Sequence, residues 1–123
     1  MVKTLEAQDN HHLIASDRVE GTAVYHVDGE KLGVIRNFLV DKKSGRAEFA
    51  IMDFGGLFGI GTDHYPLPWK LLAYDSEKGG YVIDIDRSIL AKAPRHSAAR
   101  PEYDRDFDDM VRAYYDGRPA AFI

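Results

Sequence analysis

Residues 22–54 read TAVYHVDGEKLGVIRNFLVDKKSGRAEFAIMDF, which is three short apolar runs separated by two turns. The pair Asp28-Gly29 in the first turn is the strongest short-range signal for a β-hairpin. Gly33 lies inside the second run and indicates a bulge or a sharp bend, because glycine has no side chain to pack. The third run, residues 47–54, is apolar on both faces, so we expect it at the centre of a sheet.

The strand pattern continues after a glycine-rich break at residues 55–61. Residues 65–69 can form only a short or edge strand, because each proline lacks a ladder donor. Residues 81–85 form a further strand, and residues 86–93 form one or two helical turns that Pro94 ends. Closely spaced strands without long helices between them predict an antiparallel barrel or sandwich. Closure into a small barrel is favoured because it removes the sheet edges.

The sequence divides into three parts. Residues 1–12 are a polar and mobile lead-in, residues 13–94 form the barrel, and residues 95–123 are a linker and a helical extension. Pro101 and Glu102 fit a helix start, and Gly117 fits a helix end. Apolar residues recur at helical spacing between them, at Tyr103, Phe107, Met110 or Val111, and Tyr114. This helix packs either on its own barrel or on another chain.

Composition excludes several classes of function. The 123 residues contain no cysteine, which excludes disulfides, thiolate metal sites and cysteine nucleophiles. The net charge of −4 argues against generic nucleic-acid binding, because a phosphate backbone would meet an unfavourable field. No apolar run approaches the roughly 18 residues of a membrane span, and the N-terminus does not read as a secretory signal. We therefore expect a soluble cytoplasmic protein.

The glycine-rich segment fails both phosphate-binding patterns. Gly56 and Gly61 have P-loop spacing, but Thr62 and Asp63 follow where lysine and then serine or threonine are required. In the dinucleotide-binding pattern, the third glycine would fall on His64. We expect a structural loop in which the glycines let the backbone pass close to the barrel.

The acidic run near the C-terminus begins like a calcium loop. Asp104, Asp106 and Asp108 form its opening, but Asp109 replaces the turn glycine and Tyr115 replaces the bidentate glutamate. The sequence favours a solvated acidic helix face over a metal site.

The remaining polar residues define no catalytic constellation. No pair of the five histidines has the i, i+4 spacing of a helical zinc site, and His26 and His64 are expected as surface or capping residues. Asp53 ends a buried run and is the best candidate for a perturbed carboxylate, with the amides of the glycine loop as its expected partners. The sequence therefore predicts no enzyme, no cofactor and no metal.

Aromatic and aliphatic residues supply the candidate interaction surface. Leu57, Phe58, Ile60, Tyr65 and Trp69 cluster around the glycine loop, where they either close one end of the barrel or meet a partner. The apolar face of the C-terminal helix, with Tyr103, Phe107, Met110 and Tyr114, completes this surface.

The order and spacing of several short motifs resemble the PRC-barrel family, named after a barrel in the photosynthetic reaction centre H subunit. The resemblance covers residues 15 to about 93 and rests on Ala15-Ser16-Asp17, residues 21–25, residues 28–35, residues 40–45, the glycine segment with Phe54, Pro68-Trp69, and residues 75–81. It implies a six-stranded barrel that serves binding or assembly and carries no shared catalytic residues. The chain has neither the transmembrane helix of the reaction-centre subunit nor the additional domain of a ribosome maturation factor, and it resembles the stand-alone bacterial type.

The expected function is a protein-interaction module that self-associates, with an isologous dimer favoured, and docks on a protein partner. Two alternatives stay open by analogy with the family. One is an accessory subunit of a photosynthetic or electron-transfer complex at the membrane face. The other is a ribosome-assembly factor that binds a ribosomal protein.

Overall fold

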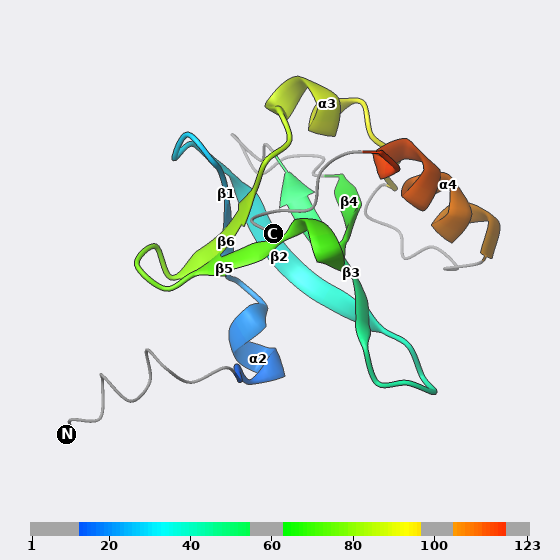
Figure 1. Ribbon diagram of the computed structural model, residues 1–123, viewed down its shortest axis with the longest axis horizontal. Helices are drawn as coiled ribbons and strands as arrows, with labels where there is room; N and C mark the ends of the chain where they lie inside the picture. Colours follow the sequence, from blue (N-terminus) through cyan, green and yellow to red (C-terminus); the bar gives the residue numbers. More distant parts are fainter. Residues whose placement is uncertain (1–12, 55–62, 97–104, 118–123) are drawn as a thin grey trace.

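A single mixed sheet of six strands organises the protein. The structure, a computed structural model, describes residues 13–54, 63–96 and 105–117. The strands are β1 (Ala23–His26), β2 (Lys31–Val40), β3 (Ala47–Phe54), β4 (His64–Pro68), β5 (Ala73–Asp75) and β6 (Gly80–Ile83), arranged in the order β4-β3-β2-β1-β6-β5 (Figure 1). The helical elements are α2 (Ser16–Val19), the 3-10 turn η1 (Trp69–Leu71), α3 (Arg87–Ala91) and α4 (Arg105–Tyr115).

The prediction of a closed antiparallel barrel is only partly right. The chain is mainly β and forms six strands, but β1 and β6 pair in parallel. The sheet is also open, because its two edge strands, β4 and β5, do not pair with each other within the described residues. Parallel pairing of β1 and β6 needs the long crossover that β2 to β5 supply, and this order was not readable from the local strand pattern.

Prolines explain why β4 is an edge. The backbone N–H of His64 donates to His96 O at 2.8 Å, so His64 turns its backbone donor away from β3. Backbone orientation alternates along a strand, and Pro66 and Pro68 therefore occupy the same outward positions but have no N–H. Beyond His64, β4 has no outward donor to offer a further strand. The expectation of an edge strand at this place is confirmed.

The bend in β2 also follows the sequence. The pairing of β1 with β2 shifts register where Val24 faces Gly33 and Tyr25 faces Lys31, so Leu32 is the extra residue of a bulge. A β-carbon placed on Gly33 would lie 2.2 Å from the backbone oxygen of Asp53 on β3. Glycine is needed here because the two backbones approach too closely for any side chain. The predicted bulge is confirmed.

The hydrophobic core lies against the sheet and extends to the helices. It is formed by buried side chains from every strand but β5 and from α2, η1, α3 and α4. Fully buried members include Val24, Ile35, Met52, Leu67, Leu71, Ile83, Leu90, Val111 and Tyr115.

The C-terminal helix packs on its own chain. In Figure 1, α4 lies alongside β4, and its residues Val111 and Tyr115 are 0% and 1% exposed. The hydroxyl of Tyr114 donates to the backbone oxygen of Ile89 in α3 at 2.5 Å. Gly117 follows the helix with a φ of 86°, which confirms the predicted C-terminal end. The predicted start at Pro101 lies outside the described residues.

Candidate interaction surface

The structure describes five of the nine residues that the sequence assigned to an interaction surface. Leu57, Phe58, Ile60 and Tyr103 lie outside the described ranges. The other five, Tyr65, Trp69, Phe107, Met110 and Tyr114, differ widely in exposure. Their positions show which of them can meet another molecule.

Tyr65 belongs to the core and not to the surface. Its side chain is 7% exposed, and its ring meets the ring of Phe54 edge-on at 5.1 Å. Burial raises the pKa of the Tyr65 hydroxyl, because the phenolate would be poorly solvated. The guanidinium of Arg95 lies 5.8 Å from the ring centre. Tyr65 therefore fixes β4 on the core and offers little area to a partner.

Trp69 is part of a row of aromatic rings. Its centre lies 5.7 Å from that of Phe38 on β2 and 5.6 Å from that of Tyr81 on β6. Tyr81 in turn contacts Tyr74 on β5 at 5.2 Å. Tyr81 is 5% exposed, and this burial raises the pKa of its hydroxyl. Tyr74 is 51% exposed at the sheet edge. The row links β2 to β6 and β5 through side chains, and sequence analysis missed Tyr74 because the short strand β5 gave no pattern.

The apolar stripe of α4 has an inner and an outer side. Phe107 and Tyr114 are half-buried and pack against the core, and the ambiguity between Met110 and Val111 resolves in favour of Val111 as the buried residue. Met110 is 50% exposed. Among the described candidates on α4, Met110 is the only one that presents about half of its surface to solvent.

Arg112 fastens α4 to the sheet. Its guanidinium lies 4.6 Å from the ring centre of Phe49 and pairs with Glu48 at 3.1 Å. Stacking on an aromatic face suits the planar guanidinium and adds to the ion pair. This residue was not singled out from the sequence, because its partners on β3 are distant along the chain.

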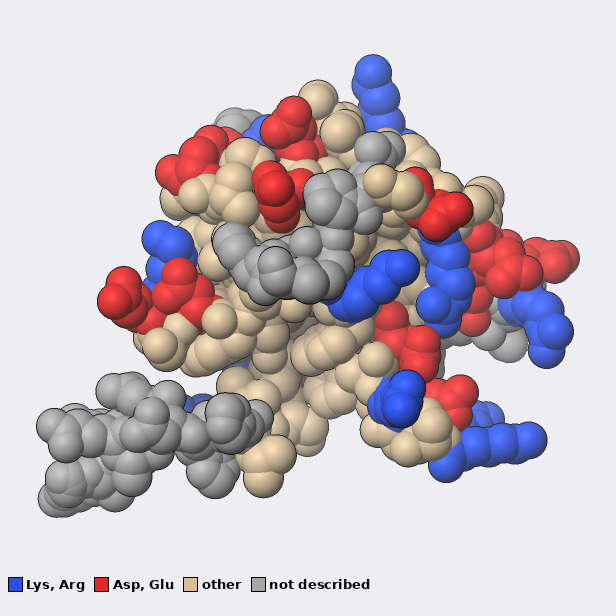
Figure 2. Space-filling model, in the orientation of Figure 1, with Lys and Arg blue, Asp and Glu red and all other residues tan. Residues whose placement is uncertain are grey.

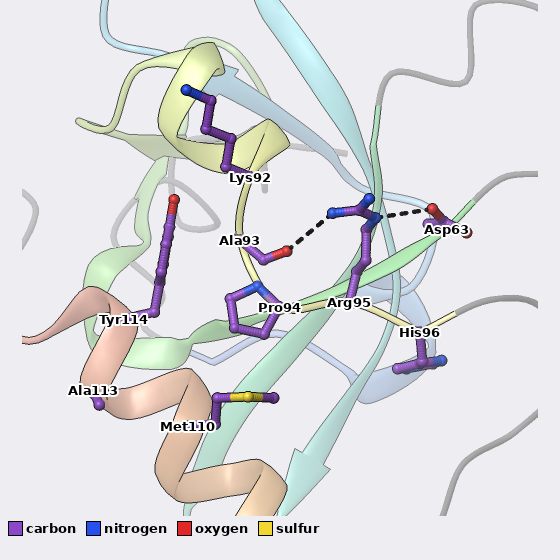
Figure 3. Close-up of a pocket in the computed structure, with 9 residues that line it drawn as sticks. All are labelled: Asp63, Lys92, Ala93, Pro94, Arg95, His96, Met110, Ala113 and Tyr114. Atoms are coloured by element: carbon purple, nitrogen blue, oxygen red, sulfur yellow. Dashed lines mark hydrogen bonds and ion pairs between the residues drawn. The ribbon is translucent and has the colours of Figure 1, made fainter.

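An open groove of about 850 Å³ lies between the end of α3 and α4 (Figure 3). Met110, Ala113 and Tyr114 supply its α4 side, and Pro94 lies opposite Met110 in this view. Arg95 turns away toward Asp63, to which it is bonded at 3.1 Å. The complete lining is Asp63, Lys92, Ala93, Pro94, Arg95, His96, Met110, Ala113 and Tyr114. The groove therefore combines apolar atoms with positive charge.

Asp53 and His64 form a structural pair beside this groove. Nδ1 of His64 lies 2.5 Å from Oδ1 of Asp53, and Nε of Arg36 lies 3.3 Å from the same oxygen. His64 is 5% exposed, so the expectation of a surface or capping histidine is wrong for this residue. The reason is that β4 places it opposite Asp53 in register, where the carboxylate satisfies a buried imidazole. The glycine loop, the expected partner of Asp53, lies outside the described residues.

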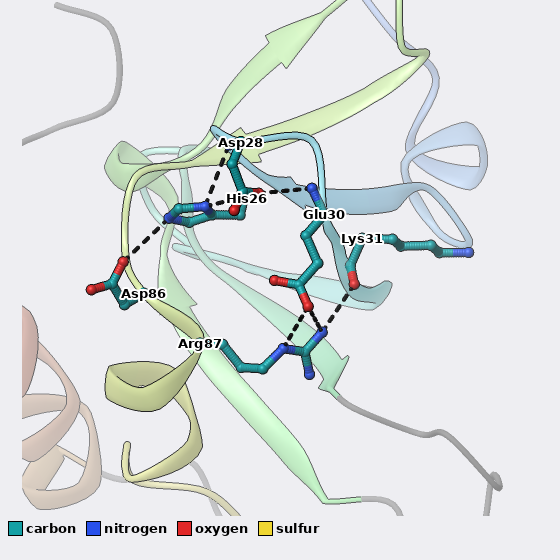
Figure 4. Close-up of polar contacts among 6 residues, drawn as sticks. All are labelled: His26, Asp28, Glu30, Lys31, Asp86 and Arg87. Atoms are coloured by element: carbon teal, nitrogen blue, oxygen red, sulfur yellow. Dashed lines mark hydrogen bonds and ion pairs between the residues drawn. The ribbon is translucent and has the colours of Figure 1, made fainter.

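His26 forms a second polar cluster at the turn between β1 and β2 (Figure 4). Its Nδ1 lies 3.1 Å from Oδ1 of Asp28, and its Nε2 lies 3.5 Å from Oδ1 of Asp86. The backbone N–H of Glu30 and the His26 side chain both lower the pKa of Asp28. Arg87 pairs with Glu30 at 3.0 Å, so the cluster ties the β1–β2 turn to the start of α3.

The charged groups form no metal-binding set in the part of the chain that is described. No three His, Asp or Glu side chains there are placed to hold a metal ion. Figure 2 shows acidic and basic side chains interspersed on the visible face. None of the helices in residues 13–54, 63–96 and 105–117 has the length and apolar character of a membrane crossing.

The six-stranded sheet, the bulged β2 and the row of aromatic rings are those of a small β module, and comparison with known families agrees. The model of the PRC-barrel domain matches residues 11–90. This match covers most of the chain, and the protein belongs to the PRC-barrel domain family. The match ends before the groove residues of the 92–96 segment and before α4.

A partial relative adds no functional information. A segment of 38 residues is 42% identical to an uncharacterized protein of Deinococcus radiodurans. The segment represents 31% of this chain and only 14% of that protein. The family assignment indicates a small protein-interaction module, and it names no partner.

Proposed function

We propose that this protein is a noncatalytic PRC-barrel module of the cytoplasm that self-associates and docks on a protein partner. The observation that carries the proposal is the groove between α3 and α4, with the exposed Met110 at its side. An exposed apolar side chain beside an open groove is the kind of surface on which proteins bind each other.

The polar clusters support a noncatalytic role. The carboxylate of Asp53 is engaged by His64 and Arg36, and His26 lies between two carboxylates that flank it. Each cluster joins two elements of the fold and has no serine or other nucleophile among its named partners. A role in holding these elements together is sufficient to explain both clusters.

The proposal is tested by a cross-linked pull-down from the native host, read by mass spectrometry. Three baits are compared: the full chain, Met110→Lys in the groove, and Val40→Lys as a control. Val40 is 47% exposed, close to the 50% of Met110, but it lies at the far end of β2. We expect a partner that both the unchanged chain and the control capture and that Met110→Lys loses.

The identity of such a partner separates the alternative roles. Subunits of a membrane-bound electron-transfer complex would favour the accessory-subunit role, and ribosomal proteins would favour ribosome assembly. A partner that is retained equally by all three baits would contradict docking through the groove. Recovery of no protein other than the chain itself would contradict the docking role and leave self-association.

A further inference from the structure

We infer that the groove between α3 and α4 receives α4 of a second copy of this chain, in a two-fold dimer. This inference rests on the proposed self-association and names its surface. Three features of the described residues carry it: an apolar stripe on the outer side of α4, a positive charge at the groove, and an acidic side chain next to the stripe.

The apolar stripe is the part of α4 that its own sheet leaves uncovered. Val111 and Tyr115 are buried in the core, whereas Met110 and Ala113 are exposed and line the groove. Residues three apart on a helix lie on one face, so these two side chains form a continuous patch. The small side chain of Ala113 permits a second helix to approach closely, and Met110 adapts its shape to a partner.

The charge at the groove comes from Lys92. Arg95 also lines the groove, but Asp63 already engages its guanidinium. Lys92 is exposed and forms no salt bridge within the described residues. In Figure 3 Lys92 lies on the α3 side of the groove, and its side chain extends away from Met110. An occupant that places an acidic group beside an apolar contact would therefore match this surface.

The chain itself carries such an occupant. Asp109 is exposed and lies one helical turn before Ala113, next to Met110 in the sequence. It forms no salt bridge in the part of the chain that is described. Helix α4 contains three aspartates, Asp106, Asp108 and Asp109, against two arginines, and is net acidic.

Two-fold symmetry pairs the basic groove residue and the acidic helix residue of both copies at once. Each copy presents Lys92 on the groove and Asp109 on the inserted helix, so one arrangement makes the same Lys92–Asp109 contact twice. The Met110 and Ala113 patches of the two copies meet at the centre. The second copy is the occupant that the charges favour, because this chain carries both the basic and the acidic member of the pair.

The charge pairing is tested by sedimentation equilibrium of the full chain over a wide range of concentration. We expect a dimer whose Kd rises about tenfold or more in Lys92→Glu and in Asp109→Lys, since each creates two like-charge contacts. The double variant, Lys92→Glu with Asp109→Lys, restores the Kd because it re-forms both pairs with reversed sign. Met110→Lys weakens the dimer, and the equally exposed control Val40→Lys leaves it unchanged.

A cross-linking measurement tests the geometry independently. The chain contains no cysteine, so Ala113→Cys introduces a single thiol at the centre of the contact. Oxidation is expected to give a covalent dimer at protein concentrations below those at which Ser44→Cys, an exposed control on the β2–β3 turn, reacts. Equal rates for the two variants would overturn the inference.

The outcomes separate this inference from the proposed function. If the chain dimerises but none of the groove variants changes the Kd, self-association stands and the groove is not its surface. If the double variant is no tighter than either single variant, the Lys92–Asp109 contact is wrong. If the chain is a monomer at every concentration, this inference and self-association both fall, while docking on another protein is still judged by the pull-down.

Discussion

Nδ1 of His64 and Oδ1 of Asp53 lie 2.5 Å apart and join the paired ends of β4 and β3. A carboxylate only accepts hydrogen bonds, so the imidazole donates its Nδ1–H. The histidine is buried while the Asp53 side chain is 29% exposed, and Arg36 reaches the carboxylate from the solvent side. The buried imidazole of His64 therefore donates to a carboxylate that lies close to the surface.

Removal of the Asp53 acceptor is therefore expected to destabilise the fold. Asp53→Ala leaves the buried donor of His64 unsatisfied, and we expect a loss of about 1–3 kcal/mol in the free energy of unfolding. Asp53→Asn keeps an acceptor oxygen and should lose less. Urea denaturation measures both. Equal stability of Asp53→Ala and the unchanged protein would show that the pair does not hold the two strands.

Docking of α4 on its own sheet is tested at Val111. Val111→Ala removes two buried methyl groups, with an expected loss of about 2–3 kcal/mol. Phe107 is half-buried, so Phe107→Ala should cost less than the roughly 3–5 kcal/mol typical of a fully buried phenylalanine. The matched control is Met110→Ala, which should stay within about 0.5 kcal/mol because Met110 is exposed.

Limited proteolysis tests the docking of α4 on the sheet independently. Arg105 and Arg112 are tryptic sites within α4, and docking protects them. We expect faster cleavage at these sites in Val111→Ala than in Met110→Ala. Identical cleavage rates in the two variants would argue that α4 does not depend on the sheet.

The close approach of β2 and β3 makes Gly33 intolerant of a side chain. Gly33→Ala would place its β-carbon 2.2 Å from Asp53 O, which is backbone and must shift as a whole. We expect a loss of about 3 kcal/mol, the upper end of the range for overpacking. Gly45→Ala is the control, because its φ of 79° is strained but no atom lies within 4 Å; its cost should be about 1 kcal/mol. The thermal midpoints of the two variants give the comparison, and equal midpoints would contradict the clash.

Acid sensitivity is expected from Asp41 in the β2–β3 turn. The backbone N–H groups of Ser44 and Lys43 donate to its carboxylate at 2.8 Å and lower its pKa. Because the lowered pKa belongs to the folded state, the ionised group stabilises the fold above the ordinary carboxylate pKa of about 4. This stabilisation is lost as the pH falls through the lowered value.

The pH effect is measured as the urea midpoint between pH 2 and pH 7. Asp41→Asn keeps an acceptor but does not titrate, so its midpoint should fall less steeply in acid than that of the unchanged protein. Glu20→Gln serves as a control, because the Glu20 side chain is exposed and makes no hydrogen bond or salt bridge within the described residues. An unchanged acid slope in Asp41→Asn would contradict a contribution from this turn.

Local patterns were sufficient where the structure depends on neighbours in the chain. The runs at residues 31–40 and 47–54 are the observed strands β2 and β3, and the Asp28-Gly29 turn joins β1 to β2. Pro94 follows the short helix α3, as its ring predicts. The short strand β5 and helix α2 were not predicted, because three or four residues are too few to show a period.

The candidate surface could be only partly predicted for a related reason. Helical spacing identified the apolar stripe of α4 but could not tell which side the sheet would cover, so Met110 and Val111 were equivalent in sequence. The burial of His64 was missed because its partner Asp53 is eleven residues away, on the neighbouring strand. The groove depends on Lys92 and Ala113, which no local motif connects.

The sequence by itself determined the main strands, the first hairpin, the bulge near Gly33, the edge character of β4 and membership in the PRC-barrel family. All of these depend on backbone preferences and on the alternation of apolar residues over short distances. The tertiary structure alone decided the parallel pairing of β1 with β6, the open sheet, the burial of His64 and the docking of α4. These features arise from contacts between residues far apart in the chain, whose free energy depends on packing and burial that no local pattern encodes.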